Sequence, residues 1–329
     1  METRMKPLKP VPISDVREAQ SRISGVALRT PLIRMNLDES ESNGNEIYLK
    51  LENLQPSGAF KLRGAVNAIK LASKTDLAKG IWTASSGNMA LSVAWAARYF
   101  GLTCNCVVAD ISPDAKLNAI EKLGGGIIKV PWLEILEICK VHHRDGMEGL
   151  FIHPFSNPRV MAGNATVGLE IVEDLPDVNA VLVPLGGGGF AASVASAVKA
   201  LKPDTKVYAA EVEAGAAFAA SLAAGRPTEV DHPPSFVSGI GSPFVFEDVW
   251  PLTRSLLDGS TVSTLDDTAR AVRLVAERAR VVAEGAGAAS LAGALSGQAG
   301  RGKIVCVISG GNIDSEKLAL ILRGKVPGH

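Results

Sequence analysis

The chain has 329 residues, which is enough for a large hydrophobic core shared between two domains or lobes. Its 34 basic and 34 acidic residues cancel, and no run of like charge stands out, which argues against a nucleic-acid or anionic-membrane partner. The apolar stretches are too short to span a bilayer, the basic N-terminus lacks the apolar segment of a secretory signal, and four scattered cysteines make no disulfide scaffold, so we expect a cytoplasmic protein.

Helix-like and strand-like segments alternate along most of the chain. Helices are expected at 13–24, 63–73, 89–100, 113–123, 132–141, 266–280 and 286–296, with another running from the glycines at 186–189 to Leu201. Strands are expected at 46–51, 79–84, 103–109, 126–130, 180–185, 206–211 and 303–309. Short apolar strands separated by helices predict an α/β fold with mostly parallel sheets. The proline- and glycine-rich stretch 225–251 is expected to be a long irregular loop, of the kind that is often functional.

The first chemical motif is QPSGAFKLRG at residues 55–64. Its Pro-Ser-Gly turn delivers Phe60 and Lys61 to the start of a helix. Phe60 and Leu62 partly desolvate the lysine between them, which lowers its pKa and favours the neutral amine that forms a Schiff base with a carbonyl. Taken alone, Lys61 fits an ordinary surface lysine in a first helical turn much better.

The second motif is SSGN at Ser85–Asn88, where a strand ends and a helix begins. The backbone N–H groups at such a helix start can bind a carboxylate or a phosphate. Ser and Asn are also favoured helix caps, so by itself the motif fits an ordinary N-cap better.

The third motif is four consecutive glycines, Gly186 to Gly189, between a buried strand and a helix that starts near Phe190. Glycine costs backbone entropy, but it lets a ligand approach the N–H groups closely, so this context predicts a phosphate cradle. The same segment fits the dinucleotide pattern G-x-G-x-x-A, with Glu211 closing the next strand. An NAD-dependent oxidoreductase is therefore the alternative from another class.

The fourth motif is SGGN, in which Ser309 ends the last apolar strand. Facing a ring nitrogen, its neutral hydroxyl could form a hydrogen bond but could not hold a proton there as a carboxylate would. We therefore hypothesise that a ring bound in this way would be a weaker electron sink, which suits an elimination reaction. A serine at a strand-to-turn junction is the simpler alternative.

Together and in this order, the four motifs resemble the serine/threonine dehydratase and serine racemase family of pyridoxal 5′-phosphate (PLP) enzymes, which have the tryptophan-synthase-β type of fold (fold type II). The similarity covers nearly the whole chain, including RTPL at 29–32, HPF at 153–155 and EGAGAAS at 284–290. It implies two three-layer α/β lobes with PLP bound between them. Residues 1–72 and 152–329 would form a large PLP-binding domain, residues 73–151 a small mobile domain, and the enzyme a homodimer.

The resemblance also implies roles for individual residues. Lys61 would carry PLP as a Schiff base and remove the Cα proton, Asn88 would bond the phenolic oxygen and Ser309 the pyridine nitrogen. The whole cofactor site would be Phe60, Lys61, Asn88, Gly186, Gly187, Gly188, Gly189, Phe190 and Ser309. The substrate carboxylate would lie on Ser85, Ser86, Gly87 and Asn88.

The reaction implied is that of a lyase: a β-hydroxy amino acid such as L-threonine or L-serine loses water and ammonia and leaves as a 2-keto acid. The chain ends at His329 soon after SGGN, which favours a catabolic enzyme without a regulatory domain. Met89 stands where the family usually has His, and the loop at 235–247 is apolar, which suggests a substrate bulkier than threonine.

Two further departures matter. Glu211 matches one acidic ligand of the family's divalent-cation site, but Ala217 stands at the second acidic position, so cation binding is doubtful. Ser86 stands where dedicated dehydratases commonly have Ala and resembles the acid/base serine of serine racemase, so an amino-acid racemase is the alternative within the family.

Overall fold

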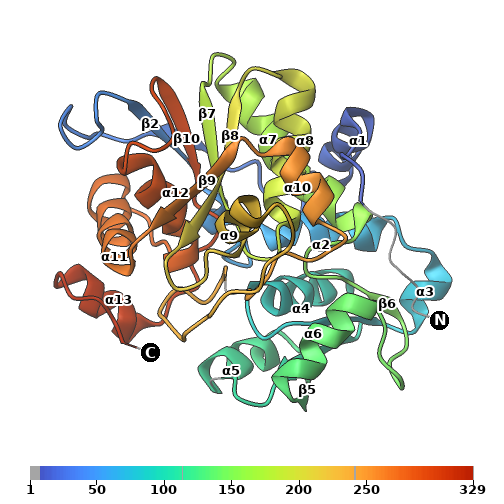
Figure 1. The fold of residues 1–329 in the computed structure, drawn as a ribbon. Helices are drawn as coiled ribbons and strands as arrows, with labels where there is room; N and C mark the ends of the chain where they lie inside the picture. Colours follow the sequence, from blue (N-terminus) through green and yellow to red (C-terminus); the bar gives the residue numbers. More distant parts are fainter. Residues whose placement is uncertain (1–7, 113, 241, 329) are drawn as a thin grey trace.

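The computed structural model describes residues 8–112, 114–240 and 242–328 (Figure 1). The first seven residues, the first residue of the helix expected at 113–123, Gly241 in the expected loop and His329 lie outside this part. Among the described residues, no helix is long and apolar enough to cross a membrane. The alternation of strands and helices is confirmed, and it forms two sheets.

The larger sheet has six strands in the order β1-β2-β10-β7-β8-β9, and all neighbours are parallel except β1 and β2. Its strands are β1 (Leu32–Arg34), β2 (Glu46–Lys50), β7 (Ala180–Pro184), β8 (Lys206–Val212), β9 (Gly259–Ser263) and β10 (Lys303–Val307). The smaller sheet has the order β5-β4-β3-β6 and is wholly parallel. Its strands are β3 (Ile81–Ala84), β4 (Cys104–Ala109), β5 (Gly126–Val130) and β6 (Leu150–Phe151).

Helices cover both faces of each sheet, so each lobe has three layers, as expected. The helices of the larger lobe are α1 (Ile13–Ile23), α2 (Lys61–Lys70), α7 (Pro158–Asp174), α8 (Gly189–Leu201), α9 (Ala217–Ala224), α10 (Trp250–Leu256), α11 (Leu265–Leu274), α12 (Gly285–Leu295) and α13 (Ser315–Leu322), and α2 also packs against α4 of the smaller lobe. Those of the smaller lobe are α3 (Lys74–Ala78), α4 (Asn88–Phe100), α5 (Asp114–Lys122) and α6 (Trp132–Val141).

Successive side chains of a strand point to opposite faces, and this sorts the core. In β10, Val305 and Val307 pack with α7 and α8, whereas Ile304 and Cys306 pack with α11 and α12. All four cysteines are buried free thiols, as expected. The predicted division into domains at 72/73 and 151/152 stays a prediction, although every strand of the smaller sheet lies between Ile81 and Phe151.

The structure differs from the sequence-based expectation in several places, since the strands β1, β6 and β9 and the helices α3, α7, α9, α10 and α13 were not expected. The helix α7 was not expected, because its residues from Val160 to Val172 are buried on all sides and show no amphipathic pattern. The helix expected at 266–280 is α-helical only to Leu274; it continues as a π-helical turn and ends at Arg280 in the left-handed conformation, with φ of 62°. Of the expected loop 225–251, the described residues between Arg226 and Val249 form no helix or strand, whereas Trp250 and Pro251 already belong to α10.

A buried ion network holds α2 in place between the two sheets. The Arg63 guanidinium is fully buried and donates to Glu52 at 2.8 Å and to Glu170 at 2.6 and 2.9 Å. The Lys50 ammonium, also fully buried, donates to Glu170 at 2.7 Å and to the carbonyl of Thr30 at 2.6 Å. Burial alone would lower the pKa of Arg63, but the two carboxylates outweigh it and raise that pKa. The network therefore joins β2, α2 and α7 through charges that are all paired.

Replacing Arg63 by Met should lower the free energy of unfolding by about 3–5 kcal/mol, because Glu52 and Glu170 would stay buried without their partner. The matched control is Arg29→Met, which removes a 46% exposed side chain from Glu173 and Asp174 and should cost about 0–1 kcal/mol. Urea unfolding of the three proteins measures both values. Equal losses in the two variants would contradict the buried-network argument.

Candidate active site

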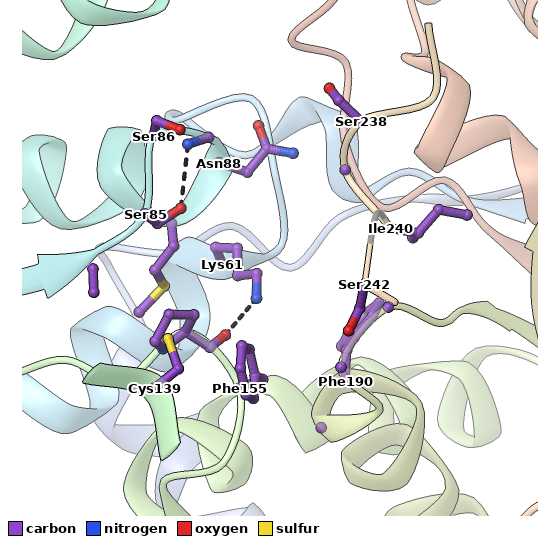
Figure 2. A pocket seen from close by; sticks show the side chains of 18 of the residues that line it. Lys61, Ser85, Ser86, Asn88, Cys139, Phe155, Phe190, Ser238, Ile240 and Ser242 are labelled. Atoms are coloured by element: carbon purple, nitrogen blue, oxygen red, sulfur yellow. Dashed lines mark hydrogen bonds between the residues drawn. The ribbon is translucent and has the colours of Figure 1, made fainter. Parts of the chain in front are cut away.

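A cavity of about 240 Å³ opens where the carboxyl ends of strands from both sheets meet (Figure 2). Ala84 ends β3, Ala109 ends β4, Pro184 ends β7, and Ser309 follows β10. This is the place where open parallel sheets usually bind ligands. The cavity brings together every residue that the sequence placed in the cofactor and substrate sites: Phe60, Lys61, Ser85, Ser86, Gly87, Asn88, Gly186, Gly187, Gly188, Gly189, Phe190 and Ser309.

Lys61 is the first residue of α2, and its side chain borders the cavity. Its Nζ donates to the carbonyl of Pro154 and lies 5.0 Å from the centre of the Phe60 ring. Burial lowers the pKa of Lys61 to about 8, from an ordinary 10.5. A large share of the amine is therefore neutral near pH 8, and the interpretation of Lys61 as a plain surface lysine is wrong.

The turn before Lys61 is fastened to the SGGN loop. Gly58 has φ of +75°, which suits glycine, and the side chain of Asn312 occupies the space that a Cβ there would need. The N–H of Phe60 donates to the carbonyl of Ser309 at 3.0 Å. The Phe60 ring stacks on Phe190, with ring centres 3.5 Å apart. The turn before Lys61 and the SGGN loop, which lie at opposite ends of the chain, thus pack against each other beside the cavity.

The SSGN turn leads from β3 into α4. Gly87 is the N-cap, and its N–H donates to Ser85 Oγ at 3.2 Å, while no side chain caps the helix itself. Within the described part of the chain, the N–H groups of Ser86 and Asn88 have no hydrogen-bond acceptor. These donors border the cavity, so the geometry favours a ligand-binding turn over an ordinary N-cap.

The glycine run starts α8 and presents more free donors. Gly188 has φ of +91°, and no described acceptor pairs with the N–H groups from Gly186 to Phe190. A Cβ on Gly189 would collide with the carbonyl oxygen of Phe155, and one on Gly186 would lie 3.2 Å from the backbone of Ile240. The glycines are therefore needed for close packing of the loop as well as for ligand approach, a reason that the sequence did not reveal.

Asn88 is held by two partners that the sequence left unassigned. Its Nδ2 donates to Glu284 Oε1 at 2.6 Å, and its Oδ1 accepts from Asn312 Nδ2 at 2.8 Å. Burial raises the pKa of Glu284 to about 7, although the Asn88 hydrogen bond and the Lys116 ammonium act against the rise. The segment EGAGAAS, at the start of α12, was the only sequence signal for this carboxyl group.

The carbonyl that accepts from Lys61 is positioned by His153, which is fully buried. Its Nδ1 accepts from the N–H of Ser156 at 2.9 Å, so Nε2 carries the hydrogen and donates to the carbonyl of Cys139 at 2.9 Å. Burial holds the pKa of His153 well below its usual value, which keeps the ring neutral. The motif HPF is thus a rigid turn that faces Lys61 with Pro154 and Phe155.

Glu211, the weak candidate for a metal ligand, is already satisfied by protein donors. Its carboxylate accepts from the N–H groups of Phe218 and Ala219 at 2.7 and 2.9 Å and from the Ser260 hydroxyl at 2.6 Å. It therefore binds the first turn of α9 and lies away from the cavity. The structure groups no three metal-binding side chains among the residues it describes, and cation binding stays untested.

PLP fits the groups that line this cavity. The unpaired N–H groups at the start of α8 suit a phosphate, and the enclosed amine of Lys61 suits a carbonyl. The hydroxyl of Ser309, whose residue is 4% exposed, has no hydrogen-bond partner among the described side chains and backbone.

Replacing Glu284 by Gln should flatten part of the pH dependence of stability. The folded state binds a proton at Glu284 up to about pH 7, whereas the unfolded state releases it near pH 4.5, so wild-type stability falls as the pH rises between these values. E284Q should lack this contribution. Urea unfolding between pH 4.5 and 8 measures the slope, and Glu137→Gln supplies the same change at an exposed position. Parallel wild-type and E284Q curves would contradict the prediction.

Comparison with known proteins gives the family directly. The family described as "Pyridoxal-phosphate dependent enzyme" matches residues 23–310. The L-threonine ammonia-lyase of Thermotoga maritima is 38% identical over 95% of this chain and 78% of its own length. A serine racemase of Oryza sativa subsp. indica is 33% identical over 92% of this chain and 91% of its own. Maize serine racemase superposes with a TM-score of 0.86 at 32% identity, covering 96% of this chain and 98% of its own.

These matches settle the choice between the two classes considered from the sequence. The NAD-dependent alternative is wrong: Glu211, which a dinucleotide ribose would need, has both carboxylate oxygens occupied by α9 and Ser260. The glycine run instead lies in one cavity with Lys61 and Ser309. The chain belongs to the family of pyridoxal-phosphate-dependent enzymes with fold type II, and its cofactor is PLP.

Proposed function

We propose that this protein is a lyase that removes water and ammonia from a β-hydroxy amino acid, such as L-threonine or L-serine, and releases a 2-keto acid. The supporting observation is the Lys61 amine, enclosed and with its pKa lowered to about 8, in a cavity that two free helix N-termini also border. The similarity to a threonine ammonia-lyase is in keeping with it.

In this proposal PLP would be held in the cavity between the two lobes. The N–H groups from Gly186 to Phe190 would hold its phosphate, Phe60 would pack beside its ring, Asn88 would bond its phenolic oxygen, and the Ser309 hydroxyl would bond its ring nitrogen; all of these residues line the cavity. Bound PLP supplies the electron withdrawal that makes the Cα proton of an amino acid acidic. Because the Ser309 hydroxyl is neutral, it would not stabilise a proton on the ring nitrogen as a carboxylate partner would.

The chain's own groups then carry out proton transfer and orientation. The free N–H groups of the Ser85–Asn88 turn hold the substrate carboxylate, and the neutral amine of Lys61 takes the Cα proton. The same proton can leave Lys61 with the β-hydroxyl as water. The carbonyl of Pro154 keeps the amine aimed into the cavity. Loss of the Cα proton and the β-hydroxyl converts the amino acid into an enamine. After its release, the enamine reacts with water to give the keto acid and ammonia.

A racemase is the second candidate, and the position of Ser86 favours it. Ser86 lines the cavity on the α4 side, with its N–H unpaired in the described structure. Racemisation needs an acid that returns a proton to Cα from the face opposite the base, and a serine hydroxyl can do this. The similarity to rice and maize serine racemases, at 33% and 32% identity, is in keeping with this candidate.

We also propose that residues 73–151 move as a small domain over the substrate, as lids commonly do. The cavity lies between this segment and the larger sheet, which is in keeping with such closure. A homodimer and a cytoplasmic location stay predictions from the sequence.

Replacing Lys61 by Ala should lower keto-acid release by at least about 100-fold, because the base and the covalent anchor are both lost. In the wild type, the visible absorbance of the bound cofactor should disappear on borohydride reduction, with the added mass on Lys61. Lys79→Ala, at an exposed lysine that pairs with Glu148, is the control and should keep full activity. A colourless protein that PLP does not restore, or a mass located on another lysine, would refute the assignment.

Replacing Ser86 by Ala separates the two activities. If Ser86 is the second acid, S86A should lose racemisation of L-serine by at least about 100-fold while it still releases pyruvate. Chiral chromatography and a keto-acid assay on the same samples measure the two products. Equal loss of both activities would show that Ser86 serves mainly to bind the substrate carboxylate.

A further inference from the structure

The lining of the cavity is divided into a polar end and an apolar wall. At the polar end, Lys116 Nζ lies 3.3 Å from the Ser238 hydroxyl, and Asn88 donates to Glu284, next to the Ser85–Asn88 turn. The apolar wall belongs to the small lobe. Outside the turn and Lys116, all the described residues of that lobe that line the cavity lack a charge, a hydroxyl or an amide side chain: Ala84, Met89, Ala109, Trp132, Ile135, Leu136 and Cys139.

The centre of this wall is one face of α6. Trp132, Ile135, Leu136 and Cys139 recur at the spacing of a helical face, and all four line the cavity. Leu133, on the same helix but off this face, is 75% exposed. Ile135 and Cys139 are buried in a cluster that also contains Ala84, Ala109 and Phe246, so the wall is fixed in place from behind and from the larger lobe.

The wall lies next to the reacting position. Cys139 and Lys61 line the same cavity, and the carbonyl of Cys139 is fixed by His153. Figure 2 shows Cys139 below the amine of Lys61, near Phe155. If the carboxylate binds at the polar end and Cα lies at Lys61, the substituent on Cβ would face the α6 side of the cavity. A charged group there would lose water and meet no charged, hydroxyl or amide side chain among the α6 residues that line the cavity, whereas an apolar group gains from burial.

We propose that the α6 face formed by Trp132, Ile135, Leu136 and Cys139 selects β-hydroxy amino acids whose Cβ carries an apolar alkyl or aryl group larger than the methyl of threonine. This rests on the proposed elimination reaction and names its substrate class. Leu136 is the sharpest probe, since it borders the cavity and is only partly buried, so its replacement disturbs the core less than that of Ile135.

The experiment measures kcat/KM for keto-acid release from L-serine, L-threonine, 3-hydroxyleucine, 3-phenylserine and 3-hydroxyaspartate with the PLP-loaded enzyme. We expect 3-hydroxyleucine or 3-phenylserine to exceed serine by at least about 10-fold, since one methylene in an apolar pocket already discriminates by 10-fold or more. 3-Hydroxyaspartate should be the poorest substrate. Serine or threonine as the best substrate would overturn the proposal.

Leu136→Asn should lower the ratio of kcat/KM for the apolar substrates to that for serine by about 10-fold or more. Leu133→Asn makes the same change at the exposed neighbouring position and should leave the ratio unaltered. A ratio unchanged in L136N would overturn the role of the wall. If L136N folds poorly, competitive inhibition of the wild type gives the second test: L-phenylalanine should bind at least about 10-fold more tightly than L-alanine, and the reverse order would contradict the proposal.

These outcomes separate the two levels of inference. A protein that binds no PLP and releases no keto acid from any substrate refutes the proposed function. A protein that releases keto acid fastest from serine keeps the proposed function and refutes the selective wall.

Discussion

The position of Lys61 depends on a charge buried two residues further along the same helix. Arg63 is enclosed between Glu52 on one side and Glu170 on the other. Both carboxylates are buried, so water cannot take the place of the guanidinium as their partner. Because an unpaired charge in such a place is very costly, the network tolerates only a narrow range of positions for the first turn of α2. The geometry of Lys61 is thereby set by an ion pair that never touches the cavity.

The cavity itself is made by loops that fasten one another. The turn at Gly58 packs against Asn312, the Phe60 N–H bonds to Ser309, and Asn312 in turn bonds to Asn88. One asparagine therefore links the lysine turn, the SGGN loop and the small-lobe helix α4. Such mutual support preorganises the polar groups before any ligand arrives, which is what electrostatic catalysis requires.

Burial favours the uncharged form of three ionisable groups around the cavity. It lowers the pKa of Lys61 to about 8, raises that of Glu284 to about 7, and keeps His153 neutral. Each effect has a different consequence. Lys61 can be a neutral amine near physiological pH, and Glu284 can change protonation state while it accepts from Asn88. The neutral imidazole of His153 keeps one orientation and positions a backbone carbonyl.

The sequence by itself determined the local features: the alternation of strands and helices, the glycine turns, the free N–H groups at the starts of α4 and α8, and the lysine that follows a Pro-Ser-Gly turn. These follow from backbone geometry over a few neighbouring residues, and their order along the chain carried the family resemblance. Only the tertiary structure decided the rest. Glu284 meets Asn88 across 196 positions, Pro154 meets Lys61 across 93, and α7 is buried on every side and so has no periodic pattern. Contacts between distant segments depend on how the two sheets pack, and a single sequence has no local signature of that packing.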